Sequence, residues 1–249
     1  MLKRERQAFI LHQVNLHNKV LSTELSQNIQ VSEDTIRRDL QELAEEKKII
    51  KVHGGALSNS FYLGPDYTEP LYSLPQKRII AKKAASLIKN GMFVLTGGGT
   101  TIIELAKLLP QQLNATFITG SIPVVMEYMK HPSIDVIVIG DKISKNSKIS
   151  IGPEAIFKIK QLKADLCFMG INAIDTSHGI SDNDWDVVQI KKAMVEAAQK
   201  VVCLTISEKI NTLCPIKVCD ISNIDVLITE LPPDDPLLEP YVKAGITVL

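Results

Sequence analysis

Near the start of the chain, hydrophobic residues recur at the spacing of α-helices. The segment 3–17 presents one apolar face that includes Phe9 and Val14, which predicts an amphipathic helix. Ser22 is placed to cap a short second helix, and residues 27–31 form the turn that follows it. The pattern therefore predicts two helices and a turn before a third helix begins.

The third predicted helix begins after this turn. Ser32 is its N-cap candidate, and the two acidic residues that follow lie in the first turn, where the helix dipole favours negative charge. Ile36 and Leu40 face a core at i, i+4 spacing. Residues 49–52 are a β-branched run that predicts a strand, and 53–55 predict a turn.

The segment 57–76 shows no hydrophobic period, because proline, glycine and asparagine interrupt it throughout. We therefore expect a linker here. It separates a first domain, residues 1–56, from a second, residues 77–249.

From residue 77 onward, apolar runs alternate with helical patterns. Because the runs have no polar face, they predict an α/β domain with a Rossmann-like, mainly parallel sheet that helices cover on both sides. The predicted strands are 92–95, 115–119, 134–139, 166–170, 201–205, 226–228 and 246–248. The predicted helices are 79–90, 102–109, 123–130, 154–162, 187–199 and 237–244.

The composition narrows this picture. Of 249 residues, 45 % are hydrophobic and 22 % are charged, so extensive disorder is not expected. The 28 Lys and Arg residues balance the 28 Asp and Glu residues, so no basic excess marks a nucleic-acid binder. A DNA-binding function must rest on where the charges lie.

The cysteines and the apolar runs indicate the compartment. Cys167, Cys203, Cys214 and Cys219 form no C-x-x-C pair and have no histidine at metal-binding spacing. We expect buried thiols in a reducing environment, and no metal or cofactor. No run approaches the ~20 apolar residues of a membrane span, and the polar N-terminus is unlike a secretory signal. The sequence predicts a cytoplasmic protein.

Residues 22–45 have the arrangement of a helix-turn-helix, in which polar residues near the start of the second helix reach DNA. Arg37 and Arg38 are able to fork onto guanine or to clamp phosphate. Asp39 and the first-turn acids fit capping, or pairing with these arginines, better than DNA contact. The same spacing also fits a small helical bundle with solvated arginines, so spacing alone leaves both interpretations open.

The run Val31-Ser32-Glu33-Asp34-Thr35-Ile36-Arg37-Arg38-Asp39-Leu40, followed by Val52-His53-Gly54-Gly55-Ala56, resembles the signature of DeoR-family bacterial transcription regulators. In that family the first run is the recognition helix, and the His-Gly-Gly segment closes the wing of a winged helix. The resemblance implies that this domain binds a double-stranded DNA operator. By position, its DNA-facing candidates are Ser32, Thr35, Arg37 and Arg38, with Lys51 and His53 on the wing near phosphate.

One such helix makes few base contacts, and each good bidentate pair contributes only ~1–3 kcal/mol of discrimination. Two or more copies on repeated half-sites would multiply that discrimination. We therefore expect a homo-oligomer, either a dimer or a tetramer. Repression is the usual mode in the family.

The segment Thr96-Gly97-Gly98-Gly99-Thr100-Thr101 separates a predicted strand from a predicted helix. Glycines let the backbone approach a ligand, and free N–H groups at a helix start favour an anion such as phosphate. The segment is neither a P-loop nor a G-x-G-x-x-G motif. An ordinary strand-to-helix turn explains the pattern equally well.

The resemblance extends over the second domain, which in DeoR regulators is a sensor similar in fold to ribose-5-phosphate isomerase and glucosamine-6-phosphate deaminase. The matching landmarks are 77–81, 99–101, 152–155, 168–171, 191–194, 207–209 and 227–230. The family implies a phosphorylated sugar or related metabolite as inducer. The effector-binding candidates are Gly98, Gly99, Thr100, Thr101, Gly152, Lys191 and Lys209.

Two positions depart from the family pattern. Gly97 stands where an aspartate is usual, and Gly120 where an asparagine is usual, so two groups suited to sugar hydroxyls are missing. The identity of the ligand therefore stays open. Lys191 also fits an exposed helix lysine, and the acidic loop 182–186 either closes over a site or is simply solvated.

These residues favour a transcriptional regulator, and we do not expect an enzyme. One alternative is a sugar-phosphate isomerase-like enzyme fused to a DNA-binding module. Isomerisation needs a placed carboxylate base, and no isomerase-like acidic motif surrounds Asp165, Asp175 or Asp184. A further alternative is a dimerisation domain that senses nothing.

Overall fold

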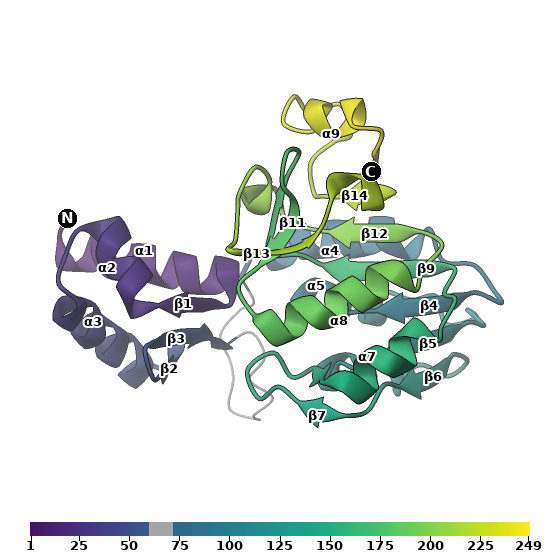
Figure 1. Cartoon of the computed structure of the whole chain (residues 1–249), viewed down its shortest axis with the longest axis horizontal. Coiled ribbons are helices and arrows are strands. Elements are labelled where there is room, and N and C mark those ends of the chain that lie inside the picture. Colours follow the sequence, from purple (N-terminus) through teal and green to yellow (C-terminus); the bar gives the residue numbers. More distant parts are fainter. Residues whose placement is uncertain (60–71) are drawn as a thin grey trace. The chain divides into compact units, whose positions relative to one another are not determined.

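The computed structural model describes residues 1–59 and 72–249, which form two compact units, Met1–Tyr72 and Ser73–Leu249 (Figure 1). Most of the predicted linker, 57–76, lies outside the described residues. At its ends, residues 57–58 belong to a strand, and a helix begins at Leu74, earlier than the sequence pattern indicates. Every helix in the described ranges is too short or too polar to span a membrane.

The first unit combines three helices with a small antiparallel sheet of strand order β1-β3-β2. The predicted helices and the predicted strand are confirmed, and β2 and β3 form the hairpin of a winged helix. The pattern does not predict β1 and β3, because such short runs show too little alternation. The elements are α1 (Lys3–His17), β1 (Lys19–Leu21), α2 (Ser22–Ile29), α3 (Glu33–Glu45), β2 (Ile49–Val52) and β3 (Gly55–Ser58).

The core of this unit positions α3 and the wing. Ile10 of α1 is buried together with Ile36 and Leu40 of α3, as the helical stripes predict. A Cβ atom at Gly55 would lie 2.0 Å from the carbonyl oxygen of Val20, so the close approach of β3 to β1 requires glycine there. The same packing therefore fixes both α3 and the hairpin of β2 and β3.

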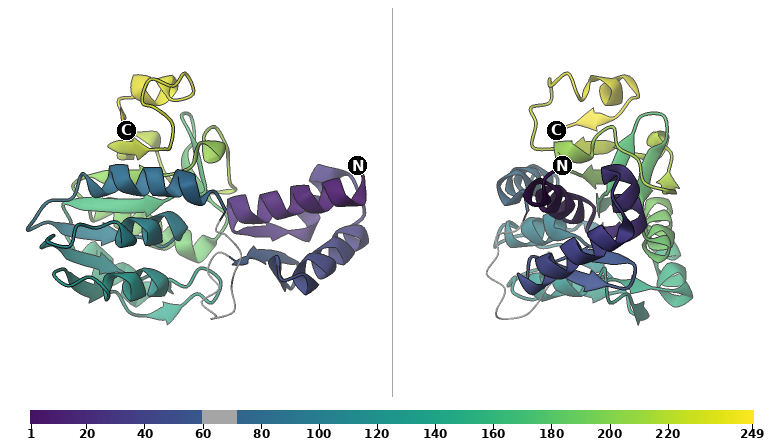
Figure 2. Two further views of the ribbon diagram at one scale, coloured as in Figure 1. Left: turned by 180° about the vertical axis from the view of Figure 1, so that it is seen from behind. Right: turned by 90° about the vertical axis from the view of Figure 1, so that its left-hand side faces the viewer.

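The second unit is built on a parallel sheet of seven strands in the order β15-β14-β12-β9-β4-β5-β6, and the predicted α/β class is confirmed. Helices α7 and α8 cover one face, and α4 and α5 cover the other (Figures 1 and 2). The strands are β4 (Phe93–Thr96), β5 (Thr116–Thr119), β6 (Asp135–Val138), β9 (Leu166–Gly170), β12 (Val201–Leu204), β14 (Val226–Ile228) and β15 (Thr247–Val248). The helices are α4 (Leu74–Ala85), α5 (Thr100–Lys107), α6 (Ile122–Tyr128), α7 (Pro153–Lys160), α8 (Trp185–Glu196) and α9 (Glu239–Lys243).

One expectation about this sheet is wrong. The apolar run 134–139 predicts a strand that is covered on both faces, but β6 is the last strand of the sheet. Ile137 and Val138 are 44 % and 49 % exposed. An edge strand has a neighbour on one side only, so part of its apolar surface stays open.

Short strands that the sequence pattern does not predict form two small antiparallel sheets. One has the order β10-β11-β13 and begins directly after β9, at the carboxyl end of the main sheet. A 3-10 helix, η2 (Ser207–Lys209), follows β12 at the same end. The strands are β7 (Lys142–Ile143), β8 (Ser150–Ile151), β10 (Ala173–Asp175), β11 (Gly179–Asp182) and β13 (Ile216–Cys219).

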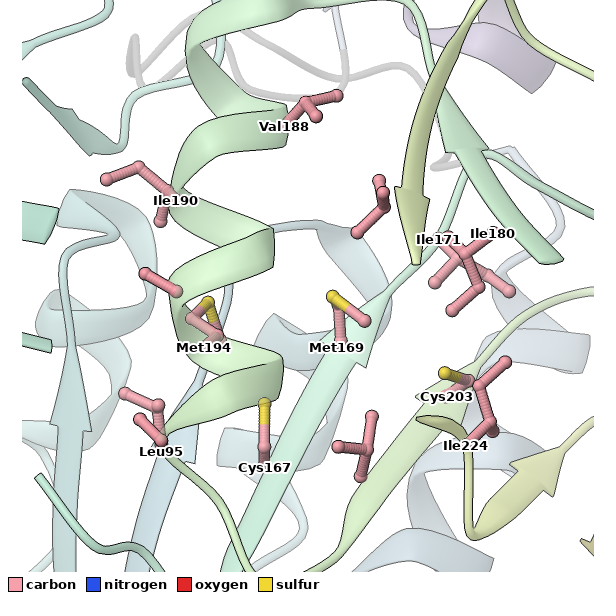
Figure 3. Packing of buried hydrophobic residues seen from close by; sticks show 14 of the residues in the cluster. Leu95, Cys167, Met169, Ile171, Ile180, Val188, Ile190, Met194, Cys203 and Ile224 are labelled. Atoms are coloured by element: carbon pink, nitrogen blue, oxygen red, sulfur yellow. The ribbon is translucent and has the colours of Figure 1, made fainter. Parts of the chain in front are cut away.

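The core between the sheet and α8 contains two of the four cysteines (Figure 3). Met194 of α8 packs in one buried cluster with Cys167 of β9 and Cys203 of β12. Burial raises the pKa of Cys167 to about 12. Cys167 and Cys203 are buried thiols as predicted, whereas Cys214 and Cys219 are only partly buried.

Candidate DNA-binding surface and effector site

The start of α3 is organised by two hydroxyl side chains. Ser32 is the N-cap as predicted: its Oγ accepts a hydrogen bond from the Thr35 backbone N–H at 3.3 Å, and the two hydroxyl oxygens lie 2.9 Å apart. Such a cap satisfies an N–H group that the first turn would otherwise leave unpaired. Both hydroxyls lie at the end of the helix that a helix-turn-helix presents to DNA.

A buried ion pair fixes the rotation of α3 against α1. Arg6 Nε donates to Asp39 Oδ2 at 2.5 Å, and the two side chains are 13 % and 2 % exposed. The hydrogen bond to Asp39 raises the pKa of Arg6, against the opposing effect of burial. The pairing of Asp39 with arginines of its own helix, which the sequence favours, is therefore wrong. Because Asp39 turns inward, Arg37 and Arg38 stay on the outer face.

The outer face of α3 borders an open hollow of about 470 Å³ beside the wing. Arg37 is 60 % exposed and donates to Asp34 and Glu33 at 3.2 and 3.3 Å. Exposed pairs of this kind contribute little free energy, so a DNA phosphate or a guanine is able to replace the two acids. The hollow is lined by Asp34, Arg37, Arg38, Gln41, Glu42, Glu45 and Lys51.

Gln41 joins the wing to α3. Lys51 Nζ on β2 donates to Gln41 Oε1 at 2.8 Å, and Gln41 Nε2 donates to Glu45 at 2.8 Å. His53 is exposed in the turn between β2 and β3. The sequence prediction omits Gln41. Its position one helical turn after Arg37, on the same face of α3, would have indicated that it belongs to this surface.

The second candidate site lies at the carboxyl end of the parallel sheet. From β4 the chain builds β5 and β6 on one side, whereas β9, β12, β14 and β15 extend the sheet on the other. The loops after β4 and β9 therefore diverge. In α/β proteins, ligands commonly bind in the crevice at such a switch point.

Gly99 is the open part of the loop after β4. Its φ is +118°, and no atom of the described residues would lie within 4 Å of a Cβ atom there. Gly98 serves packing instead, because its Cβ would lie 3.2 Å from Ser121 Oγ. Thr100 and Thr101 form the first turn of α5, and the N–H groups of such a turn favour an anion.

A buried polar chain lies at the end of β9. Lys191 Nζ of α8 donates to Asp182 Oδ2 at 2.6 Å, and Asn172 Nδ2 donates to Asp182 Oδ1 at 2.9 Å. Lys209 Nζ donates to Asn172 Oδ1 at 3.3 Å and to the carbonyl oxygen of Ile171 at 3.2 Å. The Lys191 side chain is only 12 % exposed, so its interpretation as an exposed helix lysine is wrong.

A third lysine joins this end of the sheet. Lys77 of α4 is 7 % exposed, and burial lowers its pKa to about 8, although Glu104 and Glu208 oppose that shift. Burial, with Lys77 and Lys191 adding to it, lowers the pKa of Lys209 to about 7. The sequence prediction omits Lys77 as a site residue. The sequence pattern that would have indicated Lys77 is its place on the apolar face of α4, at helical spacing from the buried Ile80, Ala81 and Ala84.

The two parts of the effector site meet through the backbone. A Cβ atom at Gly170 would lie 3.2 Å from the carbonyl oxygen of Gly98. Ile171, the next residue, accepts the hydrogen bond from Lys209. The open turn at Gly99 and the lysine cluster therefore lie at neighbouring strand ends of the same sheet edge.

Gly152 has another role in the structure. The N–H groups of Glu154 and Ala155, at the start of α7, donate to Asp141 Oδ2 at 2.9 and 3.1 Å. A Cβ atom at Gly152 would lie 2.6 Å from the same oxygen. Hydrogen bonds from the N–H groups of Lys142 and Ala155 hold the pKa of Asp141 below its ordinary value. A carboxylate of the chain itself therefore occupies the place where an effector anion would bind.

The two departures from the family pattern differ in their surroundings. A Cβ atom at Gly97 would make an ordinary contact, 3.6 Å from Met194 Cε, so packing does not require glycine there. At Gly120 the Cβ would lie 3.1 Å from the Cβ of Ser150, which would have to shift. The missing carboxylate at position 97 is thus a chemical difference within the site.

The acidic loop 182–186 is held by its own carboxylates. Asp182 belongs to the polar chain with Lys191, and Asp184 caps α8 by accepting from two N–H groups at 3.1 and 3.3 Å. Trp185 is 65 % exposed at the start of that helix. Both acids therefore have internal partners.

A winged helix with exposed arginines is the architecture of a DNA-binding regulator, and on the same chain an α/β unit has lysines and an open helix turn at the end of its sheet. Comparison with known proteins agrees with this class. Residues 6–61 match the DeoR-like helix-turn-helix domain, and residues 73–231 match the DeoR C terminal sensor domain. The chain belongs to the DeoR family of transcriptional regulators, as its resemblance indicates.

Relatives named as transcriptional regulators match this chain over nearly the whole length of both proteins. The HTH-type transcriptional regulator GolR of Listeria innocua is 32 % identical over 98 % of this chain and 97 % of its own. The HTH-type transcriptional repressor GlcR of Bacillus subtilis is 28 % identical, over 100 % and 96 %. The glycerol-3-phosphate regulon repressor of Escherichia coli is 29 % identical, over 94 % and 93 %.

Among solved structures, ribose 5-phosphate isomerase A of Methanocaldococcus jannaschii is similar to part of this chain. It has a TM-score of 0.39 and 20 % identity, and the match covers 53 % of this chain and 52 % of that one. The δ subunit of eIF2B from Chaetomium thermophilum has a TM-score of 0.47 and 16 % identity, with 64 % and 57 % covered.

Proposed function

We propose that this protein represses an operon of sugar or polyol-phosphate metabolism, and that a phosphorylated metabolite releases it from its operator. The single observation that carries the proposal is the cluster of buried lysines at the carboxyl end of the parallel sheet, near β4 and β9. There an open helix turn and three lysines meet at the switch point of the sheet. A relative that is 29 % identical is named the glycerol-3-phosphate regulon repressor, which supports this metabolite class.

In this proposal the first unit, with residues 1–56, binds operator DNA in the cytoplasm. Ser32, Thr35, Arg37 and Arg38 contact the major groove, and Lys51 and His53 contact phosphate from the wing. The exposure of Arg37 and the inward turn of Asp39 support these assignments. Since one recognition helix gives few base contacts, two or more copies of the chain act together on repeated half-sites.

The effector binds in the second unit, with residues 77–249. Its phosphate lies against the N–H groups of Gly99, Thr100 and Thr101, with Lys77, Lys191 and Lys209 supplying positive charge. Gly98 shapes the loop by packing closely against Ser121. Gly152 stays outside the site, because the carboxylate of Asp141 already binds the N-terminus of α7. Release requires that the metabolite bind the DNA-incompetent arrangement more tightly than the DNA-competent one.

The test is a panel of phosphorylated sugars and polyols, measured by thermal stabilisation of the full chain and by release of operator DNA. A ligand at a hundred times its Kd should add ~2.7 kcal/mol to the free energy of unfolding. Stabilisation with operator release and without turnover is the expected result. Turnover of a panel member would favour the isomerase-like alternative, and silence across the panel would contradict effector binding.

A further inference from the structure

Lys209 differs from the other lysines at the effector end in the atoms that hold it. Its Nζ donates to two neutral oxygens, the Ile171 carbonyl at 3.2 Å and Asn172 Oδ1 at 3.3 Å. Lys191 by contrast pairs with the carboxylate of Asp182. Among the residues that the structure describes, Lys209 has no carboxylate partner, so no direct ion pair stabilises its ammonium form.

The charged groups around Lys209 come from several elements. Lys77 of α4 and Lys191 of α8 repel an ammonium group, and burial opposes it more strongly than either. Asp182 of β11 and Cys214 act in the opposite direction, with less effect. A pKa of about 7 leaves a substantial fraction of the amine uncharged at neutral pH. A desolvated lysine beside other cations is a known form of nucleophile.

This amine lies at the same end of the sheet as the anion site. Gly170 contacts the Gly98 carbonyl closely enough that a Cβ there would be 3.2 Å from it, and Lys209 binds the residue after Gly170. Lys209 as a residue is partly exposed, whereas its amine is buried, so an effector must replace the two hydrogen bonds that Nζ donates. A phosphate anchored at the α5 terminus would thus hold the remainder of a small metabolite near Nζ.

We propose that Lys209 captures the carbonyl group of the effector as a reversible imine, so that the effector is a phosphorylated aldehyde or ketone. The inference rests on the proposed effector site. The nitrogen lone pair forms the C–N bond, and the carbonyl oxygen leaves as water with the two protons of the amine. Nothing is oxidised or reduced, and hydrolysis reverses the step.

The missing side chains at positions 97 and 120 agree with this chemistry. A carboxylate and an amide that would recognise sugar hydroxyls are absent, and packing at Gly97 does not explain the absence. Recognition of the non-phosphate end must then come from another group. A covalent bond to the carbonyl carbon provides it and rejects phosphorylated polyols that lack a carbonyl group.

The test uses the full chain, with glyceraldehyde 3-phosphate as the probe and cyanoborohydride as the reductant that fixes any imine. Peptide mapping by mass spectrometry then locates the modified lysines. We expect Lys209 to be the main site, and glyceraldehyde without phosphate to label it about tenfold less, since the phosphate anchor is missing. Labelling of Lys209 should already be efficient near pH 7, where a substantial fraction of its amine is uncharged.

Two conservative variants provide the matched controls. Lys209→Arg should lose the label and Lys192→Arg should keep it at position 209, with equal melting temperatures as the check on folding. Uniform labelling of the exposed lysines, without a preference for Lys209, would overturn the proposal. Stabilisation by both glycerol 3-phosphate and glyceraldehyde 3-phosphate without a label on Lys209 would overturn the imine and leave the proposed function standing. The absence of both stabilisation and label would contradict the effector site itself.

Discussion

The DNA-facing region and the effector end of this protein are built in opposite ways. The recognition surface comes from one helix and the neighbouring hairpin, and its arginines are exposed and lightly held. The effector end is assembled from α4, the loop after β4, the end of β9, α8 and η2, and its lysines are largely buried. One region is a continuous stretch of sequence, and the other exists only after the sheet has formed.

This difference has an energetic consequence. Exposed arginines cost little to rearrange, so in the proposed DNA contact phosphate would replace the acids without disturbing the core of the first unit. Buried lysines are costly to hold, because desolvation disfavours their charged form. Substitutions in the two regions should therefore differ in whether they change the free energy of unfolding or the affinity for a ligand.

The largest expected effect concerns the support of the DNA surface. Asp39→Ala removes the partner of Arg6 and leaves a largely buried cation unpaired, so we expect a loss of about 3 kcal/mol in the stability of the first unit. Urea unfolding followed by circular dichroism measures the loss. The fluorescence of Trp185, the only tryptophan in the chain, reports the second unit and should keep its midpoint.

The double variant Arg6→Ala/Asp39→Ala is the control for this prediction. It removes both charges, so it should lose less stability than the sum of the two single variants. Strict additivity would show that the ion pair contributes nothing. A shift of the Trp185 transition by the same amount would show that the two units do not unfold independently.

The second prediction concerns the DNA surface itself. Arg37→Ala should weaken operator binding about 10-fold to 100-fold, which is the effect of losing one good arginine contact. Unfolding should stay unchanged, because Arg37 is exposed and its ion pairs are weak. Fluorescence anisotropy with labelled operator measures the affinity. Arg4→Ala, which removes an exposed arginine of α1, is the matched control, and equal losses in the two variants would contradict a specific contact at Arg37.

The same contrast explains what the sequence predicts and what it does not. Periodicity and capping predict α3 down to its N-cap at Ser32, because both depend on residues within one turn of each other. The pairing of Asp39 with Arg6 is not predictable in this way, since the two lie on different helices and the nearer arginines compete. The inward side of α3 is therefore read correctly for its apolar residues and wrongly for its one buried acid.

The effector end is harder to predict from local sequence patterns. The glycine-rich turn at Gly99 is visible because strand, turn and helix follow one another. The role of Gly152 depends on Asp141, which reaches the start of α7 from an earlier loop. Lys77 is revealed only as a lysine on an apolar helix face, and its neighbours Glu208 and Lys209 are distant in sequence. Side chains brought together by parallel strands leave no local period to detect.

The smallest expected effect is a pH dependence that should appear at the effector end alone. Sulfate is a suitable probe, because its charge stays constant between about pH 6 and pH 9. Burial lowers the pKa of Lys209 to about 7 and that of Lys77 to about 8, both below the ordinary lysine value of 10.5. Both side chains are therefore charged below about pH 7 and mostly neutral above about pH 8, so sulfate affinity should fall about 3-fold to 10-fold across that window.

Stability without sulfate should change in the opposite direction. Between about pH 7 and pH 10.5 the unfolded chain holds more protons on these lysines than the folded chain, so the free energy of unfolding should rise with pH. Thermal melts at several pH values, with and without sulfate, measure both trends. Lys209→Gln should remove the lower-pH part of the change in affinity, and Arg37→Ala should retain it. A sulfate affinity that is flat between pH 6 and pH 9 would contradict an anion site that depends on the charge of Lys77 and Lys209.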